Sequence, residues 1–326
     1  MNRLYPLKFK PIFKDKIWGG QKVKTHFGMD YSPLPNCGEA WLISGYNDEQ
    51  SVVSDGFLEG NELNELLEVY MEELVGDNVY ERYGNEFPIL VKLIDSRDWL
   101  SIQVHPDDQL ARKRKLGNGK TEMWYVLDAG EDSELISGFN RKMSKGEYLD
   151  HLENNKLREI LNFEKVHAGD VYYIPAGRVH ALGPGVFLAE IQQTSDTTYR
   201  IHDWDRLQPD GTFRELHKEE ALDAIDFEIP EKYRTEYEVK HNETSELISS
   251  PHFTTNLISL NKALKKDYSL IDSFVIYLCV EGDFVLEHRD GKIPVSAGEA
   301  LLIPAVLNEI SIYPDGPVKL LETYLI

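Results

Sequence analysis

The chain has 326 residues, of which 41% are hydrophobic and 28% charged, and its formal net charge is −21 at pH 7. This composition predicts a globular protein with a sizeable core, arranged in one large domain or two smaller ones. The large negative charge argues against nucleic acids and anionic membranes as partners, because both would repel the chain.

The cysteine content and the start of the chain favour a cytoplasmic protein. Cys37 and Cys279, two in all, are too few for a disulfide framework and lack the spacing of a thiolate zinc site. The opening segment MNRLYPLKFKP lacks the apolar stretch of a secretory signal, and the longest strongly apolar run, 274–280, is too short to cross a bilayer. We therefore expect a cytoplasmic location. Separately, we expect a monomer or a weak homo-oligomer.

Helical periodicity is confined to a few stretches of the chain. Apolar residues recur at helical spacing over 63–75. A second helix is expected over 144–161, where Ser144 and Glu147 form a capping box at its start, and a third over 218–225. The remainder reads as short strands separated by Gly, Pro, Asn and Asp, which is typical of a sandwich or barrel.

A weak internal repeat indicates two related β units. Residues 167–180 read HAGDVYYIPAGRVH and residues 296–309 read SAGEALLIPAVLNE, with Ala-Gly-acid and Ile-Pro-Ala at identical spacing. A strand that ends in glycine precedes each copy, MWYVLDAG at 123–130 and VIYLCVEG at 275–282. Coincidence between two common strand patterns is the alternative, but the agreement of both blocks favours a duplicated β unit.

The segment WLSIQVH at 99–105 predicts a strand with one polar face. Side chains alternate across a strand, which gives two sets, Leu100, Ile102 and Val104 on one face and Ser101, Gln103 and His105 on the other. A row of polar side chains inside a barrel is unusual unless it holds something polar. Together with Glu122 and His180 further along, the set is typical of a site for zinc, iron, nickel or manganese.

Each of these residues alone has an ordinary structural explanation. A single histidine on a strand is more often a hydrogen-bonded structural residue, and Glu122 alone would more often be a surface acid. The motif G-x5-P-x-G-x2-H, formed by Gly169, Pro175, Gly177 and His180, strengthens the metal hypothesis because it resembles the second signature of the cupin barrels. The first cupin signature is less well matched, since Gln103 and His105 replace its His-x-His.

Four segments together resemble the type I mannose-6-phosphate isomerases, a branch of the cupins. They are SIQVHPDD at 101–108, GKTEMWYVL at 119–127, IPAGRVHAL at 174–182 and AEIQQTSDTTYR at 189–200. The resemblance is strong over about the first 210 residues and follows the family's order.

The resemblance implies a mainly β fold of two cupin jelly-roll β-barrel units, with a few α-helices inserted in or flanking the N-terminal one. The expected domains are a catalytic domain at 1–235 and a cupin-like domain at 236–326 that lacks metal ligands. In the second repeat, Phe274 stands where Glu122 stood and Glu309 where His180 stood.

The resemblance also implies the chemistry, an interconversion of mannose 6-phosphate and fructose 6-phosphate through an enediol. It implies one Zn²⁺ per chain, with four ligands: Gln103, His105, Glu122 and His180. It implies three catalytic residues, Arg200, Lys120 and Glu190, while Ser101 is expected to line the substrate cavity. The general base stays open between Glu190, His202, Asp203 and a metal-bound water.

Phosphate binding in so acidic a chain requires a local group of basic residues. The segment ARKRKLGNGK at 111–120 packs five basic residues into ten, and we interpret it as a positive rim, with Arg206 as a further phosphate contact. The alternative is a short helix whose charged face is simply solvated.

Two other functions remain open at this point. Two histidines and one carboxylate also suit an iron dioxygenase, although Gln103 would occupy a position that oxygen needs. A non-catalytic sugar-binding cupin is the other alternative, but it would not need Lys120, Glu190 and Arg200 together.

Overall fold

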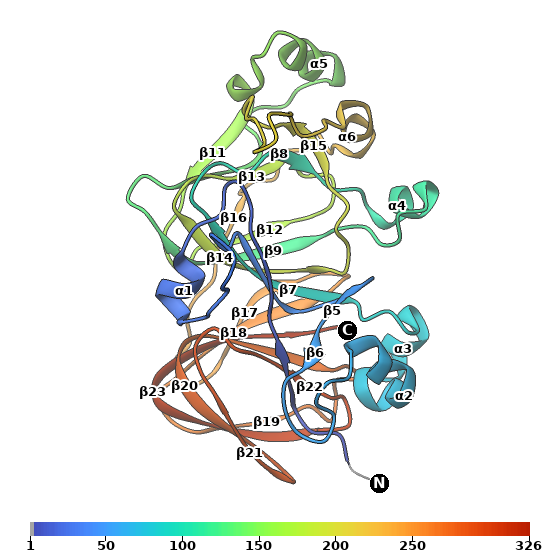
Figure 1. Cartoon of the computed structure of the whole chain (residues 1–326), viewed down its shortest axis with the longest axis vertical. Coiled ribbons are helices and arrows are strands. Elements are labelled where there is room, and N and C mark those ends of the chain that lie inside the picture. Colours follow the sequence, from blue (N-terminus) through green and yellow to red (C-terminus); the bar gives the residue numbers. More distant parts are fainter. Residues whose placement is uncertain (1–2) are drawn as a thin grey trace. The chain divides into compact units, whose positions relative to one another are not determined.

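The structure is a computed structural model that describes residues 3–326, and most of its regular structure is β-sheet (Figure 1). The helices are α1 (Lys22–Phe27), α2 (Leu63–Val75), α3 (Asp77–Tyr83), α4 (Asp108–Arg114), α5 (Lys145–Glu153) and α6 (Lys218–Ala224), with a 3₁₀ turn η1 (Leu157–Glu159). No helix within the described residues is long and apolar enough to cross a membrane.

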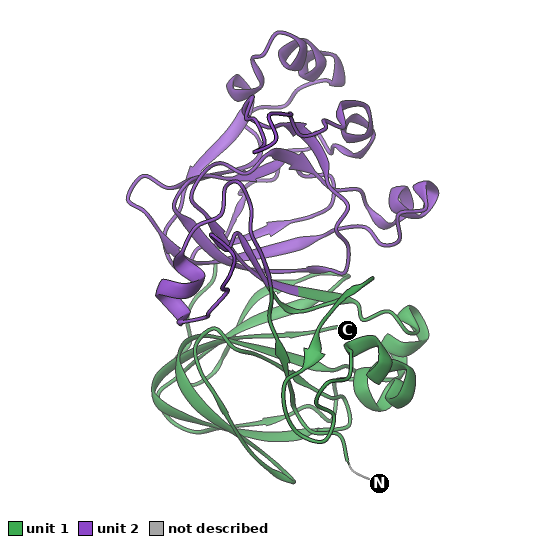
Figure 2. Ribbon diagram, in the orientation of Figure 1, with its two compact units in different colours: residues 1–12, 41–90, 236–326 green, residues 13–40, 91–235 purple. Residues whose placement is uncertain are grey.

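The chain forms two compact units (Figure 2). Unit 1 comprises Met1–Ile12, Trp41–Leu90 and Glu236–Ile326, and unit 2 comprises Phe13–Ala40 and Val91–Thr235. The predicted boundary after residue 235 coincides with the end of unit 2. Two segments that we had placed in the N-terminal domain lie in unit 1 instead, because their strands pair there: β1 (Leu7–Lys10) joins β6 (Val52–Val53) to β22 (Ala300–Ile303).

Unit 2 is built mainly from two sheets that share one core. The seven-stranded sheet has the order β16 (Arg234–Thr235), β12 (Val171–Ile174), β9 (Glu122–Ala129), β14 (Val186–Gln193), β7 (Ile89–Ser96), β3 (Glu39–Ile43), β2 (Ile12–Lys14). Residues 41–43 of β3, 89–90 of β7 and Ile12 of β2 are counted in unit 1. The five-stranded sheet has the order β11 (Leu161–Lys165), β10 (Glu134–Phe139), β13 (His180–Leu182), β8 (Ile102–Val104), β15 (Tyr199–His202). Trp124 and Leu188 of the first sheet pack with Leu135 and Leu182 of the second.

Unit 1 is dominated by one nine-stranded sheet. Its path is β17 (Thr244–Ser249), β18 (Thr254–Leu260), β23 (Glu309–Tyr324), β20 (Val275–His288), β22, β1, β6, while β19 (Leu264–Asp267) pairs with β23 and β21 (Gly291–Val295) with β20. A short ladder joins β4 (Gly45–Tyr46) to β5 (Glu49–Gln50). The mainly β cupin fold is confirmed, but no sheet among the described residues closes on itself, so the predicted barrels are open sheets that enclose their cores.

Two of the three predicted helices are confirmed, and the third is shorter than predicted. α2 and α6 cover the predicted ranges to within one residue, although the backbone of α2 is non-helical at Met71 (φ 47°, ψ −123°). α5 begins as predicted, because the Ser144 hydroxyl accepts the Glu147 N–H at 3.2 Å, but it ends at Glu153. The apolar positions beyond it were wrongly assigned to the helix, since Ile160 follows a 3₁₀ turn and Leu161 begins β11.

The two repeat copies occupy matching places in the two units. In unit 2, Ile174 lies opposite Glu122 in the β12–β9 ladder, and in unit 1 Ile303 lies opposite Val275 in the β22–β20 ladder. Val275 therefore takes the position of Glu122, and the predicted equivalence with Phe274 is wrong by one residue. The consequence for the second unit is unchanged, because valine offers no metal ligand.

Candidate active site

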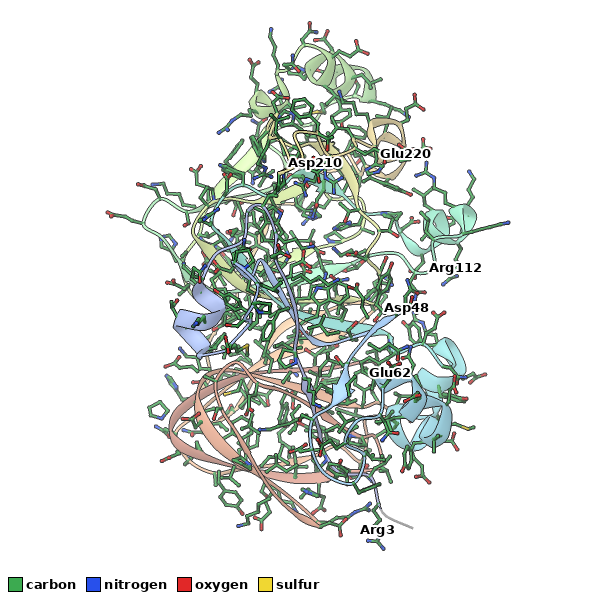
Figure 3. The ribbon with its side chains drawn as sticks, in the orientation of Figure 1. Arg3, Asp48, Glu62, Arg112, Asp210 and Glu220 are labelled. Atoms are coloured by element: carbon green, nitrogen blue, oxygen red, sulfur yellow. The ribbon has the colours of Figure 1, made fainter. Side chains whose placement is uncertain are left out.

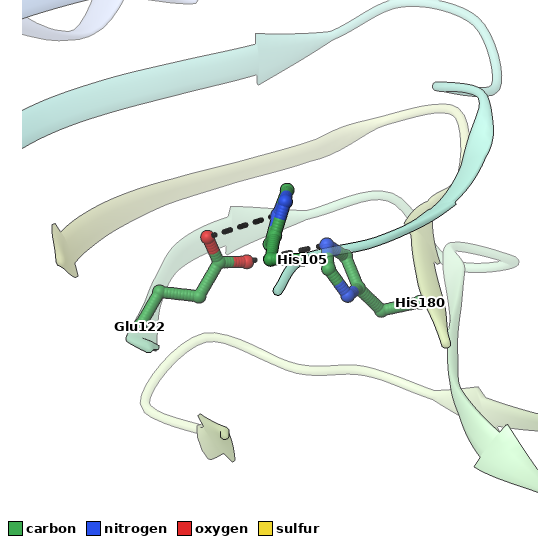
Figure 4. A group of neighbouring side chains, drawn as sticks. All are labelled: His105, Glu122 and His180. Carbon is green, nitrogen blue, oxygen red and sulfur yellow. Dashed lines mark ion pairs between the residues drawn. The ribbon is translucent and has the colours of Figure 1, made fainter. Parts of the chain in front are cut away.

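Three side chains that were predicted as metal ligands meet inside unit 2 (Figure 4). Glu122 begins β9, His180 begins β13 and His105 follows β8, and each side chain is at most 1% exposed. The Glu122 carboxylate lies 3.6 Å from His105 Nε2 through Oε2 and 3.3 Å from His180 Nε2 through Oε1. Residues far apart in sequence thus point their donor atoms at one small volume.

A glycine turn positions both histidines. Gly177 has φ +89°, and a Cβ there would lie 3.0 Å from the Ala224 carbonyl oxygen, so the turn requires glycine. The Gly177 N–H donates to the His105 carbonyl at 2.9 Å, and the chain then enters β13 at His180. The predicted motif therefore has the structural role that its glycine suggested.

Both imidazoles present Nε2 to the centre as an unprotonated nitrogen. Nδ1 of His105 lies 2.9 Å from the Thr197 carbonyl oxygen and Nδ1 of His180 lies 2.9 Å from that of Arg178. A carbonyl only accepts, so each Nδ1 carries the hydrogen. Burial lowers the pKa of His180 to about 4 and that of His105 well below its ordinary value, so both rings are neutral, as metal ligands must be.

Gln103, predicted as the fourth ligand, lies beside this group on β8. It lies directly opposite His180 in the β13–β8 ladder, and its amide nitrogen is 3.2 Å from His180 Nε2. A half-turn of the amide exchanges its nitrogen and oxygen, which would bring Oε1 to the same point. Ser101, two residues earlier on the same face, donates to Gln103 Oε1 at 3.3 Å.

The residues present fit a divalent cation. Both buried oxygens of Glu122 have ion-pair neighbours but accept no well-directed hydrogen bond from a described residue. The Lys120 ammonium, 3.2 Å from Oε2, offsets part of the carboxylate charge, and an ionised carboxylate still has lone pairs for a further cation. Two neutral imidazoles, a carboxylate and an amide form a donor set that suits zinc, and also iron, nickel or manganese. Within residues 3–326, this is the one group of three or more such side chains.

A cavity of ≈ 240 Å³ opens beside these ligands, entirely within unit 2. Six residues predicted for the site line it: Ser101, Gln103, Lys120, His180, Glu190 and Arg200. Other charged residues of its wall were not predicted: Lys16, Glu39, Lys92, Asp196 and Arg214. The structure therefore brings together most of the predicted residues in one enclosed space.

Lys120 reaches the centre from the segment before β9. Its ammonium lies 3.2 Å from Glu122 Oε2 and 3.2 Å from His105 Nε2. Burial lowers the pKa of Lys120, but the carboxylates of Glu122, Glu190 and Asp196 outweigh it and hold the pKa above its ordinary value. Lys120 is therefore charged.

Glu190 lies on β14, in the wall of the cavity. Trp124 Nε1 donates to Glu190 Oε2 at 3.0 Å, and Lys92 Nζ is 3.5 Å from Oε1. Burial, and then the negative charge of Glu122, raise the pKa of Glu190. Lys92 was missed at the sequence level, although a lysine within the apolar run of β7 is a signal of a buried charge that needs a partner.

Several predicted or candidate residues lie outside the cavity wall. Arg206 pairs with Asp203 at 2.9 Å and with Asp98 at 3.2 Å, and neither it nor His202 nor Asp203 lines the cavity. Of the basic run, Arg112 is 71% exposed and lies on α4 (Figure 3). The basic run therefore forms a solvated helix face, which was the alternative to a phosphate-binding rim. Of its residues, only Lys120 at the end of the run lines the cavity.

Comparison with known proteins identifies the family. The family model for the phosphomannose isomerase type I catalytic domain matches residues 6–137, and the model for the mannose-6-phosphate isomerase cupin domain matches residues 242–324. Mannose-6-phosphate isomerase ManA of Bacillus subtilis is 36% identical, covering 98% of this chain and 99% of that protein. The mannose-6-phosphate isomerase of Streptococcus mutans is 33% identical, covering 98% of both.

Solved structures agree with this assignment. The crystal structure of mannose 6-phosphate isomerase from Bacillus subtilis superposes with a TM-score of 0.88 at 33% identity, covering 98% of this chain and 99% of that one. A solved structure from Archaeoglobus fulgidus, at 19% identity and a TM-score of 0.79, shares the fold. The chain belongs to the type I phosphomannose isomerase family.

Proposed function

We propose that the chain interconverts D-mannose 6-phosphate and D-fructose 6-phosphate by moving a proton between C1 and C2 through an enediol. The observation that carries this proposal is the single cavity in which Lys120, Glu190 and Arg200 lie beside the His105–Glu122–His180 group. Close relatives over the full length carry the name of this isomerase, which supports the choice of substrate.

The proposed cofactor is one Zn²⁺ per chain, held by the two histidines, Glu122 and Gln103. When bound, zinc would act as a Lewis acid that favours negative charge on a sugar oxygen. Zinc does not change its oxidation state, which suits an isomerisation without net electron transfer. The preference for zinc over iron, nickel or manganese belongs to this proposal, since the donor set accepts all four.

The protein's own residues have to overcome the weak acidity of a carbon beside a carbonyl group. We assign the proton transfer to Glu190, because His202 and Asp203, the other side chains considered, do not line the cavity. Lys120 is placed to donate to a sugar oxygen as negative charge develops on it. Arg200, which lies opposite Gln103 in the β15–β8 ladder, orients the sugar.

The charge of the cavity wall supports the binding of a phosphorylated substrate by so acidic a chain. Its wall carries five basic side chains, Lys16, Lys92, Lys120, Arg200 and Arg214, and three acidic ones, Glu39, Glu190 and Asp196. The balance there is positive, whereas the whole chain carries −21. A locally positive cavity in a negative molecule raises the concentration of an anionic substrate where it reacts.

A cytoplasmic location is proposed as well. Both cysteines are unpaired and buried, which suits a reducing compartment.

A coupled assay of fructose 6-phosphate formation from mannose 6-phosphate tests the function. Arg200→Ala should lower kcat/KM by about 100-fold, the effect of removing one positioned charged donor. Arg234→Ala is the matched control, since that arginine pairs with Asp170 at 3.3 Å outside the cavity, and it should leave kcat/KM unchanged. The proposal would be contradicted if the protein without substitutions showed no isomerase activity, or if Arg200→Ala kept full activity. Oxygen uptake in place of isomerisation would support a dioxygenase.

A further inference from the structure

A second guanidinium faces the cavity beside Arg200. Arg214 lines the same wall, and its side chain is 20% exposed. Its Nε donates to Asp203 Oδ2 at 2.7 Å, and its Nη2 donates to Asp203 Oδ1. This two-point contact fixes the plane of the guanidinium, so Arg214 presents its remaining nitrogen in a defined direction.

Arg214 lies at the far end of a row that starts at the metal ligands. In the five-stranded sheet, His180 lies opposite Gln103, and Gln103 lies opposite Arg200. The segment after Arg214 continues this row, because the His217 N–H donates to the Arg200 carbonyl at 2.8 Å and Arg200 Nη1 donates to the Glu215 carbonyl at 2.9 Å. Neighbouring strands are roughly 5 Å apart, so this segment is roughly 10 Å from Gln103.

The two guanidinium groups hold donors that the contacts described above do not use. Arg200 Nε is buried without a hydrogen-bond partner, and the contact with Asp203 uses Nε and Nη2 of Arg214 but not Nη1. Both arginines line the same cavity, where like charges repel, and burial and next the charge of Arg214 lower the pKa of Arg200. Asp203 offsets this charge only in part, since it also pairs with Arg206. An anion between the two arginines would satisfy the free donors and relieve the repulsion.

We infer that Arg214, oriented by Asp203, binds the phosphate group of the substrate beside Arg200 and so selects phosphorylated over free sugars. This inference rests on the proposed function, because the reacting carbons and the phosphate lie at opposite ends of a hexose 6-phosphate. If the reacting carbons of the sugar lie beside His180 and Gln103, its phosphate lies farther along this row, near Arg214. Asp203 is then a positioning residue, and the basic run of α4 has no part in binding.

The test compares Arg214→Gln with Arg206→Gln in the metal-loaded protein. Both changes remove one partner of Asp203, but Arg206 does not line the cavity. Arg214→Gln should raise KM for mannose 6-phosphate, and the inhibition constant of inorganic phosphate, by about 10- to 100-fold, as expected for a lost charge-assisted hydrogen bond. Its kcat should change far less. Arg206→Gln should leave the inhibition constant of phosphate near its original value.

Unchanged phosphate inhibition in Arg214→Gln, or equal weakening by both variants, would overturn the inference. If Arg214→Gln does not fold, Arg214→Lys serves instead, because a lysine keeps the charge but loses the two-point geometry, and phosphate inhibition should still weaken. Calorimetric binding of inorganic phosphate separates this inference from the proposed function. If the protein without substitutions binds phosphate through Arg214 but does not isomerise the sugar, the proposed function is refuted, whereas the phosphate site at Arg214 stands.

Discussion

Glu190 shows how its surroundings set the chemistry of one buried carboxylate. The indole of Trp124 and the ammonium of Lys92 hold its two oxygens at 3.0 Å and 3.5 Å. Burial raises its pKa, which makes it a better proton acceptor than an exposed glutamate. Since it also lies in the cavity wall, it combines basicity with access to a bound sugar.

Glu190→Gln therefore tests proton transfer with little change in shape. Glutamine keeps an oxygen for the Trp124 N–H but does not accept a proton, so kcat should fall by about 100- to 10,000-fold. KM and the metal content should stay near their original values, because the ligands are untouched. Steady-state kinetics and elemental analysis measure both, and a kcat within tenfold of the unchanged enzyme would assign the transfer to another group.

For single residues, the sequence predicted which face of a strand a side chain lies on. It did not predict which side chains of different strands come together. Strand alternation alone placed Ser101 and Gln103 on one face, and both line the cavity. That Glu122 and His180 meet His105 depends on which strands pair, and that expectation came from family resemblance rather than from spacing. The sequence suggested Arg206 as a phosphate contact because it is basic. Its pairing with Asp98 and Asp203 is not visible in any local sequence pattern.

At the scale of elements, helix α1 depends on a side chain from a distant strand. The residue before it, Gln21, makes no capping hydrogen bond through its side chain, and the carboxylate of Asp95 on β7 accepts the Lys22 N–H instead. Asp95 is 2% exposed, and a Cβ on Gly20 would lie 2.3 Å from its oxygen, so the contact requires glycine there. Burial raises the pKa of Asp95 to about 6.

This raised pKa predicts a stability effect with a definite sign. The neutral form is favoured in the folded state, so the contribution of Asp95 is fully present below about pH 4 and is lost as the pH rises through about 6. At pH 7 the charged form costs up to about 3 kcal/mol. Asp95→Asn keeps an acceptor for Lys22 and should therefore gain stability relative to the unchanged protein between about pH 4 and about pH 7.

Urea unfolding across that pH range measures the difference. Asp132→Asn is the control for net charge, because that side chain is 93% exposed. A difference between Asp95→Asn and the unchanged protein that does not vary with pH would contradict the pKa argument.

Elements were predictable where local patterns and tertiary packing agree. The capping box at Ser144 located the start of α5, but the apolar residues after Glu153 serve the core of unit 2 from a 3₁₀ turn and a strand. Periodicity does not separate these cases, because Leu157 and Ile160 are buried in either conformation. The start of α1 depends on Asp95, which no local pattern shows.

At the scale of the whole molecule, the duplicated β unit keeps a buried carboxylate at one position. Glu190 lies opposite Trp124 in unit 2, and Glu322 lies opposite Tyr277 in unit 1, at matching positions of the repeat. Unlike Glu190, Glu322 is not part of the wall of the unit 2 cavity, and it accepts from Asn256 and Lys266, each at 2.8 Å, and from Tyr268. We interpret this cluster as structural.

Glu322→Ala should therefore destabilise unit 1 by about 3 kcal/mol, the lower end for a broken buried pair, because Lys266 is partly exposed. Cys279 in unit 1 and Cys37 in unit 2 report the effect, since burial raises the pKa of both thiols to about 12 and protects them from labelling. Cys279 should become labelled at lower urea than in the unchanged protein. Glu309→Ala removes an exposed ion pair with Lys265 and should not change the urea concentration at which Cys279 is labelled. If Glu322→Ala does not change the urea concentration at which Cys279 is labelled, the structural role of Glu322 is refuted.

We predict that one divalent ion binds at His105, Glu122 and His180 and that none binds in the repeat's second copy. Elemental analysis of three purified proteins tests it most directly: the unchanged protein, His180→Ala and Glu309→Ala, whose exposed glutamate takes the repeat position of His180. We predict one zinc per chain in the unchanged protein and in Glu309→Ala, and none in His180→Ala. Metal-free protein with full isomerase activity, or zinc retained in His180→Ala and lost in Glu309→Ala, would contradict the account.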